Sequence, residues 1–520
     1  MIEPELTLRD LIHRAAEKYP DSEAVVDNLY RYSYRQLLDH IQRMAKLLHG
    51  LGVRKGDRVA LLMPPSASHV IALFGAIELG AIPCALHVRE SESTLAAILH
   101  RLSARVLVHD IAFDDLAKSL HASDGSVTGR VAAASGLVPA KGDGSDALPV
   151  IPACLDRYEL DFEPMPLDVE DYAVIALSSG TTGIPKGVMH THRTLVASAR
   201  CGAHYMLADE NACTTIIFST AFIGWYNCTL PFLYGASKIV YLNRWDPRQY
   251  LQAMENEQTT VCFLVPTMWR MLLREKPEDY NLSFLKRVGY AGEPMDVATM
   301  TQIREKICDK VINTYGTTET GSWGGCTVML PDDYANEKKI ASVGKPGTGV
   351  ELRIIQPGGS SEDTVPVGEE GEVILRGPSI ASQLWEQPGL AREIFDNGWW
   401  RSGDMGVQDD DGYLYLRGRT DDMIISGGIN VMPGPVEEFV LGHPAVSECV
   451  VVGVPDEQWG QRIVAFVLCE TPVTEMELNE YVSASSLSAY KKPREYRFVE
   501  ELPRGNTGKV SRKLLRERLL

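Results

Sequence analysis

Between residues 171 and 318, short β-branched runs alternate with longer segments that have the apolar spacing of helices. The segments Thr194–Met206 and Asp296–Cys308 are expected to be two of these helices. The alternation predicts βαβ units in a mainly parallel sheet, in which ligands bind at the carboxyl ends of the strands. The expected strands are Ala173–Leu177, Thr214–Phe218, Lys238–Leu242, Thr260–Val265, Arg287–Tyr290 and Lys310–Asn313.

The regions on either side have patterns of their own. Residues 1–150 alternate in a similar way, with a strand at Arg58–Leu62 and helices at Arg35–Leu51 and Ser68–Leu79, which predicts a second sheet layer. After Val343, hairpin-like pieces between Gly, Pro and Asp turns predict a small β lobe. We therefore predict an α/β fold with a multi-sheet, doubly wound N-terminal domain that includes the lobe, over residues 1–420, and a mobile α+β C-terminal domain over residues 421–520.

Composition restricts the class of function. The 520 residues carry a net charge of −18, so most of the surface repels polyanions, and we expect neither nucleic-acid nor membrane binding. The chain has no apolar run near the roughly 18 residues of a membrane span, and its first residues lack the pattern of a secretory signal. Its ten cysteines form no C-x-x-C pair. These features predict a cytoplasmic enzyme.

A loop rich in glycine, serine and threonine follows the expected strand Ala173–Leu177. Its glycines allow backbone N–H groups to face a phosphate, its hydroxyl groups add donors, and Lys186 adds a positive charge. The Walker A spacing does not fit, so the loop predicts another kind of polyphosphate site, with a plain Gly/Ser turn as the less favoured alternative. The residues expected to bind phosphate are Ser178, Ser179, Gly180, Thr181, Thr182, Gly183 and Lys186.

This loop is the first of six segments that resemble, in order, the motifs of the adenylate-forming superfamily. That superfamily comprises acyl-CoA synthetases, acyl-carrier adenylation domains and luciferases. The sequence is identified as a member over nearly its whole length, and its motifs are most similar to those of chlorobenzoate- and benzoate-type CoA ligases. The six segments are Ser178–Gly187, Ala291–Pro294, Tyr315–Glu319, Trp400–Asp404, Gly418–Asp422 and Pro503–Lys509.

The resemblance implies an ATP site. Tyr315 would stack on adenine, Thr318 would bind the α-phosphate, and Glu319 would be a ligand of Mg²⁺. Asp404 would accept hydrogen bonds from the ribose hydroxyls, and Arg419 would donate to ribose and phosphate. Taken singly, a core aromatic, a solvated carboxylate and a surface ion pair are the commoner roles of such residues. The other residues implied for the nucleotide are Gly292, Glu293, Pro294, Asn313, Gly316 and Thr317.

The resemblance also assigns catalysis and thiol transfer. Lys509 is expected to stabilise the charge that builds up when a carboxylate attacks the α-phosphorus, although a solvated lysine in a basic tail is the alternative. Lys186, Thr318 and Glu319 complete the expected catalytic set, and Asp421 is the expected hinge. For Trp459 and Tyr490, burial in the core is an equal alternative to a place in the CoA site. The expected CoA residues are Gly427, Gly428, Trp459, Tyr490 and Lys492.

An acid pocket with short aromatic walls is implied by position in the family, and it would suit small aryl or short-chain acids. The alternative is that these aromatic residues only pack a helix against the sheet. Many relatives carry a gating histidine in the segment that matches residues 221–224, but here no histidine lies between His204 and His443, so Phe222 or Trp225 would be the gate. The expected pocket residues are Phe222, Trp225, Tyr226, Tyr290, Ala291, Gly292, Trp323 and Gly324.

The expected activity is that of an ATP-dependent acid:CoA ligase. It would use ATP, Mg²⁺ and CoA, form an acyl adenylate with release of pyrophosphate, and then form the acyl-CoA thioester. One alternative passes the adenylate to a carrier protein or another nucleophile, with an unusual acid as a further option. A regulatory nucleotide-binding protein is the other alternative, which the presence of Lys186, Glu319, Asp404 and Lys509 together disfavours. A homodimer is also expected.

Overall fold

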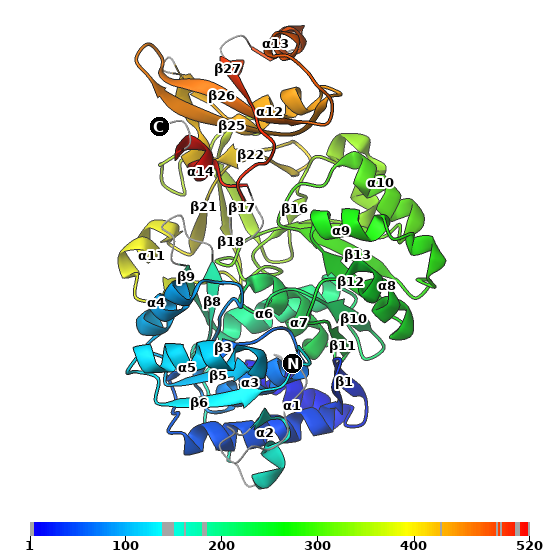
Figure 1. Ribbon diagram of the computed structural model, residues 1–520, viewed down its shortest axis with the longest axis vertical. Coiled ribbons are helices and arrows are strands. Elements are labelled where there is room, and N and C mark those ends of the chain that lie inside the picture. Colours follow the sequence, from blue (N-terminus) through cyan, green and yellow to red (C-terminus); the bar gives the residue numbers. More distant parts are fainter. Residues whose placement is uncertain are drawn as a thin grey trace. The chain divides into compact units, whose positions relative to one another are not determined.

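The described part of the chain falls into two compact units. The computed structural model describes residues 5–137, 150–160, 163–178, 185–426, 429–484, 487–488, 491–504 and 510–517. The N-terminal unit comprises residues 1–351 and 375–400, and the C-terminal unit comprises residues 352–374 and 401–520 (Figure 1). The C-terminal unit thus contains most of the β lobe, which the sequence pattern assigns to the N-terminal domain. The domain boundary at residue 420 stays a prediction.

A nine-stranded sheet with a parallel centre forms the middle of the N-terminal unit. In spatial order its strands are β16 (Lys345–Pro346), β15 (Thr327–Met329), β14 (Val311–Tyr315), β13 (Arg287–Ala291), β12 (Val261–Leu264), β10 (Cys213–Ile216), β11 (Lys238–Tyr241), β1 (Glu23–Val26) and β2 (Arg31–Ser33). The strands from β14 to β1 pair in parallel, and the others are antiparallel edges. The mainly parallel sheet is therefore confirmed.

A second sheet lies in the same unit and is parallel throughout. Its order is β4 (Ile82–Ala85), β3 (Arg58–Leu62), β5 (Val106–Asp110), β6 (Gly129–Ala133) and β7 (Val150–Ile151). The helices α4 (Glu92–Leu102) and α5 (Asp114–Ser123) contribute to a core on one of its faces. The second sheet layer predicted from residues 1–150 is confirmed.

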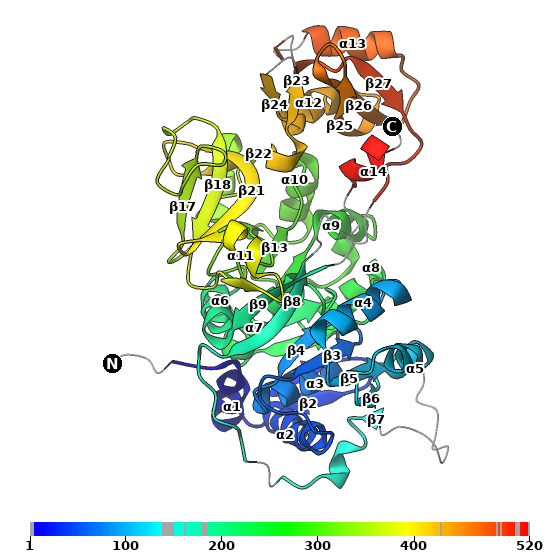
Figure 2. The same ribbon diagram turned by 90° about the vertical axis from the view of Figure 1, so that its left-hand side faces the viewer.

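A layer of helices shares one continuous core with both sheets. These helices are α1 (Leu8–Lys18), α2 (Tyr34–Gly50), α3 (Ala67–Glu78), α6 (His192–Tyr205) and α7 (Ile223–Tyr234). A different set, α8 (Pro247–Asn256), α9 (Pro266–Leu273) and α10 (Val297–Lys306), lies along the large sheet away from α6 and α7 (Figures 1 and 2). Every residue of α3 is buried, as expected for a helix that is apolar on all sides.

The strand predicted at Ala173–Leu177 does not join the large parallel sheet. It forms β8 (Tyr172–Ser178), which pairs antiparallel with β9 (Lys186–Thr191), and β19 (Gln383–Leu384) pairs with β9 on the other side. The expectation of a parallel strand here is wrong, because the segment between β8 and β9 is too short for the crossover that parallel pairing needs. The proposed phosphate loop therefore joins two antiparallel strands.

The β lobe and the C-terminal segment form two further sheets. The lobe contains β17 (Glu351–Ile355), β18 (Gly371–Arg376), β20 (Phe395–Asp396), β21 (Trp399–Gln408) and β22 (Leu414–Arg419). The other sheet has β24 (Ile429–Val431), β23 (Ile424–Ser426), β26 (Gly460–Cys469), β25 (Val446–Asp456) and β27 (Glu495–Phe498), with α12 (Pro433–Leu441), α13 (Glu475–Ala484) and α14 (Arg512–Glu517). The remaining helix, α11 (Pro388–Ile394), belongs to the N-terminal unit. In the part of the chain that the structure describes, no helix combines the length and the apolar character needed to span a membrane.

Three histidines of the N-terminal unit are buried in the neutral form. Burial lowers the pKa of His69 to about 3, and it lowers the pKa of His190 and of His192 to about 4. His69 lies edge-on against Trp225, with 4.8 Å between the ring centroids. Because the unfolded chain hydrates a charged imidazole freely, protonation of each of these residues favours unfolding.

We expect the melting temperature to fall as the pH is lowered from about 6.5 to 4, because each of these histidines has a folded pKa below its unfolded value and the unfolded chain binds more protons in this window. Each buried histidine should lower the free energy of unfolding by roughly 1 kcal/mol for every unit that the pH falls within this window. Calorimetry across this range should show a smaller fall for His69→Phe than for the wild type. His100→Phe changes an exposed histidine and should follow the wild type. An identical pH dependence for all three proteins would contradict the prediction.

Candidate functional site

The carboxyl edge of the large sheet collects the predicted acid and nucleotide segments of the N-terminal unit. The parallel strands β10, β12, β13 and β14 are consecutive neighbours in this sheet. The segment that leads to Phe222 follows β10, the turn at Gly292 follows β13, and Tyr315 ends β14. Because parallel strands place their carboxyl ends at one edge, segments far apart in the sequence meet there.

The turn after β13 has a backbone form that favours glycine. Gly292 is exposed and has a φ of +90°, in the left-handed region that other residues rarely adopt. Next to it, the carboxylate of Glu293 accepts a hydrogen bond from the hydroxyl of Thr267 at 3.0 Å, and Pro294 is exposed. The proposed adenine turn is thus an exposed backbone surface at the sheet edge, with Ala291 half-buried at the end of β13.

The segment from Asn313 to Glu319 runs from the sheet into a tight loop. Asn313 lies within β14 opposite Tyr290 and is buried, while Tyr315 is half-buried at the end of the strand. Gly316 is exposed, and a Cβ on it would lie 2.8 Å from the hydroxyl of Thr320, so the loop has no room for a larger residue there. Thr317 donates its backbone N–H to the same hydroxyl at 3.1 Å.

Three consecutive carbonyl groups of this loop accept hydrogen bonds from other segments. The carbonyl of Thr318 accepts from Nε2 of His190 at 2.8 Å. The carbonyl of Glu319 accepts from the backbone N–H of Ala381 at 2.9 Å, and that of Thr320 accepts from the hydroxyl of Ser379 at 2.6 Å. These donors hold three successive peptide planes, so the side chains of Thr318 and Glu319 leave the backbone in defined directions.

The hairpin of β8 and β9 lies against this loop. Ser178 ends β8 and is paired in register with Lys186, the first residue of β9. The hydroxyl of Ser178 donates to the carboxylate of Glu319 at 3.4 Å. The structure therefore brings the base of the proposed phosphate loop to the proposed Mg²⁺ ligand. The remaining loop residues predicted to bind phosphate lie outside the described residues: Ser179, Gly180, Thr181, Thr182 and Gly183.

The donor set at Glu319 fits magnesium brought in by a nucleotide. Mg²⁺ is typically held by one or two protein carboxylates, with phosphate oxygens and water as its other ligands. Within the described ranges, no group of three or more His, Cys, Asp and Glu residues could hold a metal ion. Glu319 is half-buried at the loop and next to a serine hydroxyl, which supplies hard oxygen atoms and leaves the rest of the coordination to the phosphates.

Most aromatic residues of the predicted acid pocket are buried. Trp225 and Tyr226 on α7 belong to the core that the two sheets share, as does Trp323, whose Nε1 donates to the carbonyl of Asn227 at 2.9 Å. Tyr290 is also buried, and its hydroxyl accepts a hydrogen bond from that of Tyr334 at 3.4 Å. The last predicted pocket residue is Gly324, and a Cβ on it would lie 3.1 Å from the side chain of Ser379.

Phe222 differs from these buried residues because it is half-buried at the N-cap of α7. His87 lies beside it, with 5.0 Å between the ring centroids, and Nδ1 of His87 is 3.1 Å from the hydroxyl of Ser219. Burial lowers the pKa of His87, which favours the neutral ring. Sequence reasoning missed His87, because it follows β4 and no motif links that strand to the segment at Phe222.

The predicted ribose-binding residues form an ion pair in the C-terminal unit. Asp404 on β21 lies directly opposite Arg419 on β22. Nη1 of Arg419 donates to the carboxylate of Asp404 at 2.9 Å and to the carbonyl of Ser402 at 3.0 Å. The carboxylate is largely buried, whereas the guanidinium is about half exposed at 48%. The pair therefore presents a hydrogen-bond donor at the surface and holds an acceptor beside it.

Ion pairs join the segment after the predicted hinge to the end of the chain. Arg516 on α14 pairs with Asp422 at 2.7 Å, and Arg512 pairs with Asp422 at 3.4 Å and with Glu437 at 2.6 Å. The backbone of the predicted hinge residue Asp421 lies in the short turn before β23. Lys509, which precedes α14 in the sequence, lies outside the described residues.

Two of the predicted CoA residues are described. Trp459 lies in the turn between β25 and β26 and is half-buried, so its burial in the core is excluded, and the guanidinium of Arg494 lies 3.8 Å from its ring centroid. Lys492 donates to the carbonyl of Ser483 at 3.3 Å. Sequence reasoning did not place Arg494 in the CoA site. The other predicted CoA residues lie outside the described residues: Gly427, Gly428 and Tyr490.

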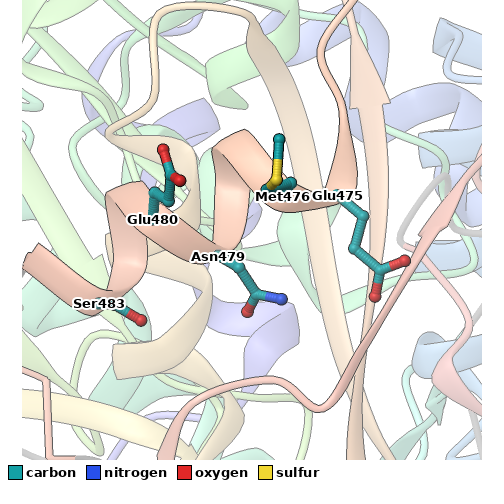
Figure 3. A pocket seen from close by; sticks show the side chains of 5 residues that line it. All are labelled: Glu475, Met476, Asn479, Glu480 and Ser483. Atoms are coloured by element: carbon teal, nitrogen blue, oxygen red, sulfur yellow. The ribbon is translucent and has the colours of Figure 1, made fainter.

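A hollow of about 510 Å³ lies along α13, and its lining includes Ser483, whose carbonyl accepts the hydrogen bond from Lys492 (Figure 3). Its lining comes from successive turns of this one helix, where Met476 is 68% exposed. An open helix face does not exclude water from a reaction, so we assign no catalytic role to it. The lining residues are Glu475, Met476, Asn479, Glu480 and Ser483.

Comparison with known proteins identifies relatives along nearly the whole chain. The AMP-binding enzyme family matches residues 12–385, and the AMP-binding enzyme C-terminal domain matches residues 435–509. The long-chain-fatty-acid–CoA ligase FadD13 of Mycobacterium tuberculosis is 30% identical over 506 residues, which cover 94% of this chain and 93% of that protein. A feruloyl-CoA synthase of Amycolatopsis sp. is 29% identical over 511 residues, or 97% of each chain.

A solved structure agrees with these matches. The anthranilate CoA ligase AuaEII, in complex with anthranoyl-AMP, superposes with a TM-score of 0.84 at 27% identity, over 99% of this chain and 98% of that one. Its match extends over both units described above. The chain belongs to the AMP-binding enzyme family of adenylate-forming enzymes and is an AMP-forming acyl-CoA synthetase that uses ATP, Mg²⁺ and CoA.

Proposed function

We propose that this synthetase activates a small aryl or short-chain carboxylic acid, first as the acyl adenylate with release of pyrophosphate and then as the acyl-CoA thioester. The observation that carries the choice of acid is the filling of the space beside α7. Trp225, Tyr226 and Trp323 are each at most 2% exposed. If the acid binds beside them, as their positions in the family imply, they would leave no room for a long acyl chain. Cavities in such a core are costly, so the space is not opened without a change in structure.

The relatives differ in the acid that their names give. FadD13 is a long-chain-fatty-acid ligase, whereas the feruloyl-CoA synthase and the anthranilate ligase act on aromatic acids. At these identities the chain length of the acid does not follow from the relatives alone. The aromatic packing beside α7 favours an aromatic acid. The motifs at residues 315–319 and 421–428 favour it too, because they are most similar to those of ligases that act on benzoate-type acids.

We assign the steps of adenylate formation to residues at the sheet edge and in the C-terminal unit. Lys186 and Thr318 would bind phosphate oxygens, and Asp404 with Arg419 would orient the ribose hydroxyls. Lys509 would place an ammonium where negative charge builds up between the attacking carboxylate and the α-phosphate, which stabilises the transition state more than the ground state. Magnesium held by Glu319 and the phosphates would neutralise charge on the leaving pyrophosphate.

Thiol transfer then needs a different arrangement around the adenylate. We propose that the C-terminal domain rotates about Asp421, and that Gly427 and Gly428 leave room for the pantetheine arm beside the backbone. Trp459, Tyr490 and Lys492 would contact the nucleotide part of CoA. The stacked Arg494 adds a positive charge on the face of Trp459, which suits a phosphorylated ligand.

A panel of acids, each tested with and without CoA, decides between these reactions. We expect acid-dependent pyrophosphate release with benzoate-like acids, and mass spectrometry should then detect the CoA thioester. Adenylate without thioester would favour transfer to a carrier protein or another nucleophile. No ATP turnover with any acid would contradict the proposal.

We also propose that the enzyme is cytoplasmic and forms a homodimer. Cell fractionation would test the location, and analytical ultracentrifugation would test the oligomeric state.

Replacing Phe222 should widen the range of acids. The side chain is half-buried, so Phe222→Ala opens the entrance beside His87 with less effect on the core than a change at Trp225. We expect kcat/KM for octanoate relative to benzoate to rise by roughly tenfold, in line with a change of one to two kcal/mol in apolar contact. Phe218→Ala removes a ring that packs against Gly224 on the same segment and is the matched control. A ratio unchanged in Phe222→Ala, or raised equally in both variants, would argue against Phe222 as the gate.

Replacing Lys509 should separate the two half-reactions. Lys509→Ala removes the ammonium that adenylate formation uses, so acid-dependent pyrophosphate release should fall by roughly a hundredfold or more. The rate of thioester formation from a supplied acyl adenylate should stay within about twofold of the wild type, because the adenylate already contains the bond between the carboxylate and the α-phosphate. Lys513→Ala changes an exposed lysine on α14 and should leave both rates unchanged. Equal loss of both half-reactions in Lys509→Ala would refute the assignment.

A further inference from the structure

His190 is a buried residue of β9 that the roles proposed above do not use. Its side chain is fully buried. Nε2 lies 2.8 Å from the carbonyl of Thr318, and Nδ1 lies 3.3 Å from the hydroxyl of Thr194 on α6. A carbonyl oxygen only accepts hydrogen bonds, so Nε2 carries the proton. Burial lowers the pKa of the ring to about 4, and the imidazole is therefore neutral and of a single tautomer at physiological pH.

The bond from His190 connects two segments that are far apart in the sequence. β9 begins at Lys186, directly after the proposed phosphate loop, and Thr318 precedes the proposed Mg²⁺ ligand Glu319. The peptide group that accepts the bond joins Thr318 to Glu319. The carbonyls of Thr318 and Glu319 are both held, so the planar peptide groups on either side of Cα of Glu319 are fixed, and with them the direction in which its side chain leaves the backbone.

The turn that follows is packed directly on the imidazole. Gly321 has a φ of +62°, and a Cβ on it would lie 3.2 Å from Cε1 of His190 and 2.3 Å from the carbonyl oxygen of Ser379. A residue with a side chain would therefore not fit beside the ring without a shift in this turn. By contrast, the other two external donors to the loop, at Ala381 and Ser379, come from a segment near β19 and have no connection to the phosphate loop along the chain.

We infer that His190 is a positioning residue for adenylate formation, which aligns Thr318 and Glu319 with the phosphate loop so that Mg²⁺ and the phosphates of ATP are bound in one geometry. The inference rests on the roles proposed for Thr318 and Glu319. It does not depend on which acid the enzyme activates. Without the bond, the carbonyl of Thr318 keeps only the longer bond from the backbone N–H of Gly321, at 3.2 Å, so the Thr318–Glu319 peptide is less restrained. Misplacement of a binding group by about 1 Å is enough to lower the rate by up to a hundredfold.

Two amide substitutions separate the bond to Thr318 from other effects of the ring. The side-chain nitrogen of glutamine lies the same number of bonds from Cβ as Nε2 of histidine, and that of asparagine corresponds to Nδ1. His190→Gln should therefore restore the donor to Thr318, while His190→Asn should reach only the side of Thr194. His190→Leu removes both polar atoms. The matched control is His192→Leu, because His192 is also buried but accepts its hydrogen bond from the N–H of Leu8, at 3.2 Å, away from the loop.

The primary measurement is the affinity for ATP with and without Mg²⁺, by calorimetry in the absence of any acid. The wild type should bind ATP more tightly with Mg²⁺, and this gain should fall by about tenfold in His190→Leu and His190→Asn but by less than about threefold in His190→Gln. His192→Leu should lower the melting temperature and keep the gain. Equal gains in the glutamine and asparagine variants, or the full wild-type gain in His190→Leu, would overturn the inference. If His190→Leu does not fold, the glutamine and asparagine pair decides.

A second measurement uses the two half-reactions with an acid that the wild type activates. Pyrophosphate release should fall by about tenfold in His190→Asn, while thioester formation from the supplied acyl adenylate should stay within about twofold. Equal losses in both half-reactions would indicate a merely structural role and contradict the inference. A wild type that binds Mg²⁺ and ATP but activates none of the small acids would instead contradict the proposed substrate class and leave the calorimetric result on His190 decisive.

Discussion

The external hydrogen bonds to the loop at residues 318–320 are the constraint on which the nucleotide half of the N-terminal unit depends. Each of the three carbonyl groups accepts from a different donor, namely His190, Ala381 and Ser379. The loop leaves the sheet, and its own backbone bonds are two long turn bonds, from Thr320 to Thr317 at 3.3 Å and from Gly321 to Thr318 at 3.2 Å, so its conformation depends on donors from outside. The donors achieve this, and they give Thr318 and Glu319 fixed directions before any ligand is present.

The same unit uses one set of aromatic side chains for two purposes. Trp225, Tyr226 and Trp323 fill the core between the sheets and also stand where the family's acid pocket is expected. These residues can therefore be part of the core and walls of the predicted acid pocket at the same time. A wall that is also core is rigid, which favours discrimination between acids by size, and leaves Phe222 as the half-buried residue whose change costs the core least.

Electrostatic contacts have a comparable part in the C-terminal unit. Asp422 and Glu437 pair with Arg512 and Arg516, which ties α14 to the segment next to the predicted hinge. These pairs are only partly buried, so each adds modest stability, and they act together with Leu515, which α14 buries in an apolar core with β25 and β26. The carboxylate of Glu437 also accepts from the backbone N–H of Val451, which links the network to β25.

The sequence by itself determined the family and the order of the elements that it predicted, with the ends of most of these within one or two residues of the observed ones. The helices predicted at Arg35–Leu51 and Ser68–Leu79 are α2 and α3, with each boundary moved by a single residue. They could be predicted because apolar periodicity and the residues that begin and end a helix are local signals. The motifs likewise proposed roles for Tyr315, Glu319 and Asp404, since their residue types and spacing are local. Only the tertiary structure decided that β8 leaves the parallel sheet, that Asp404 pairs with Arg419, and that His87 and His190 lie beside Phe222 and Thr318. Those partners are separated by many residues, and a contact of that kind arises from how the strands are ordered in space, which no local pattern records.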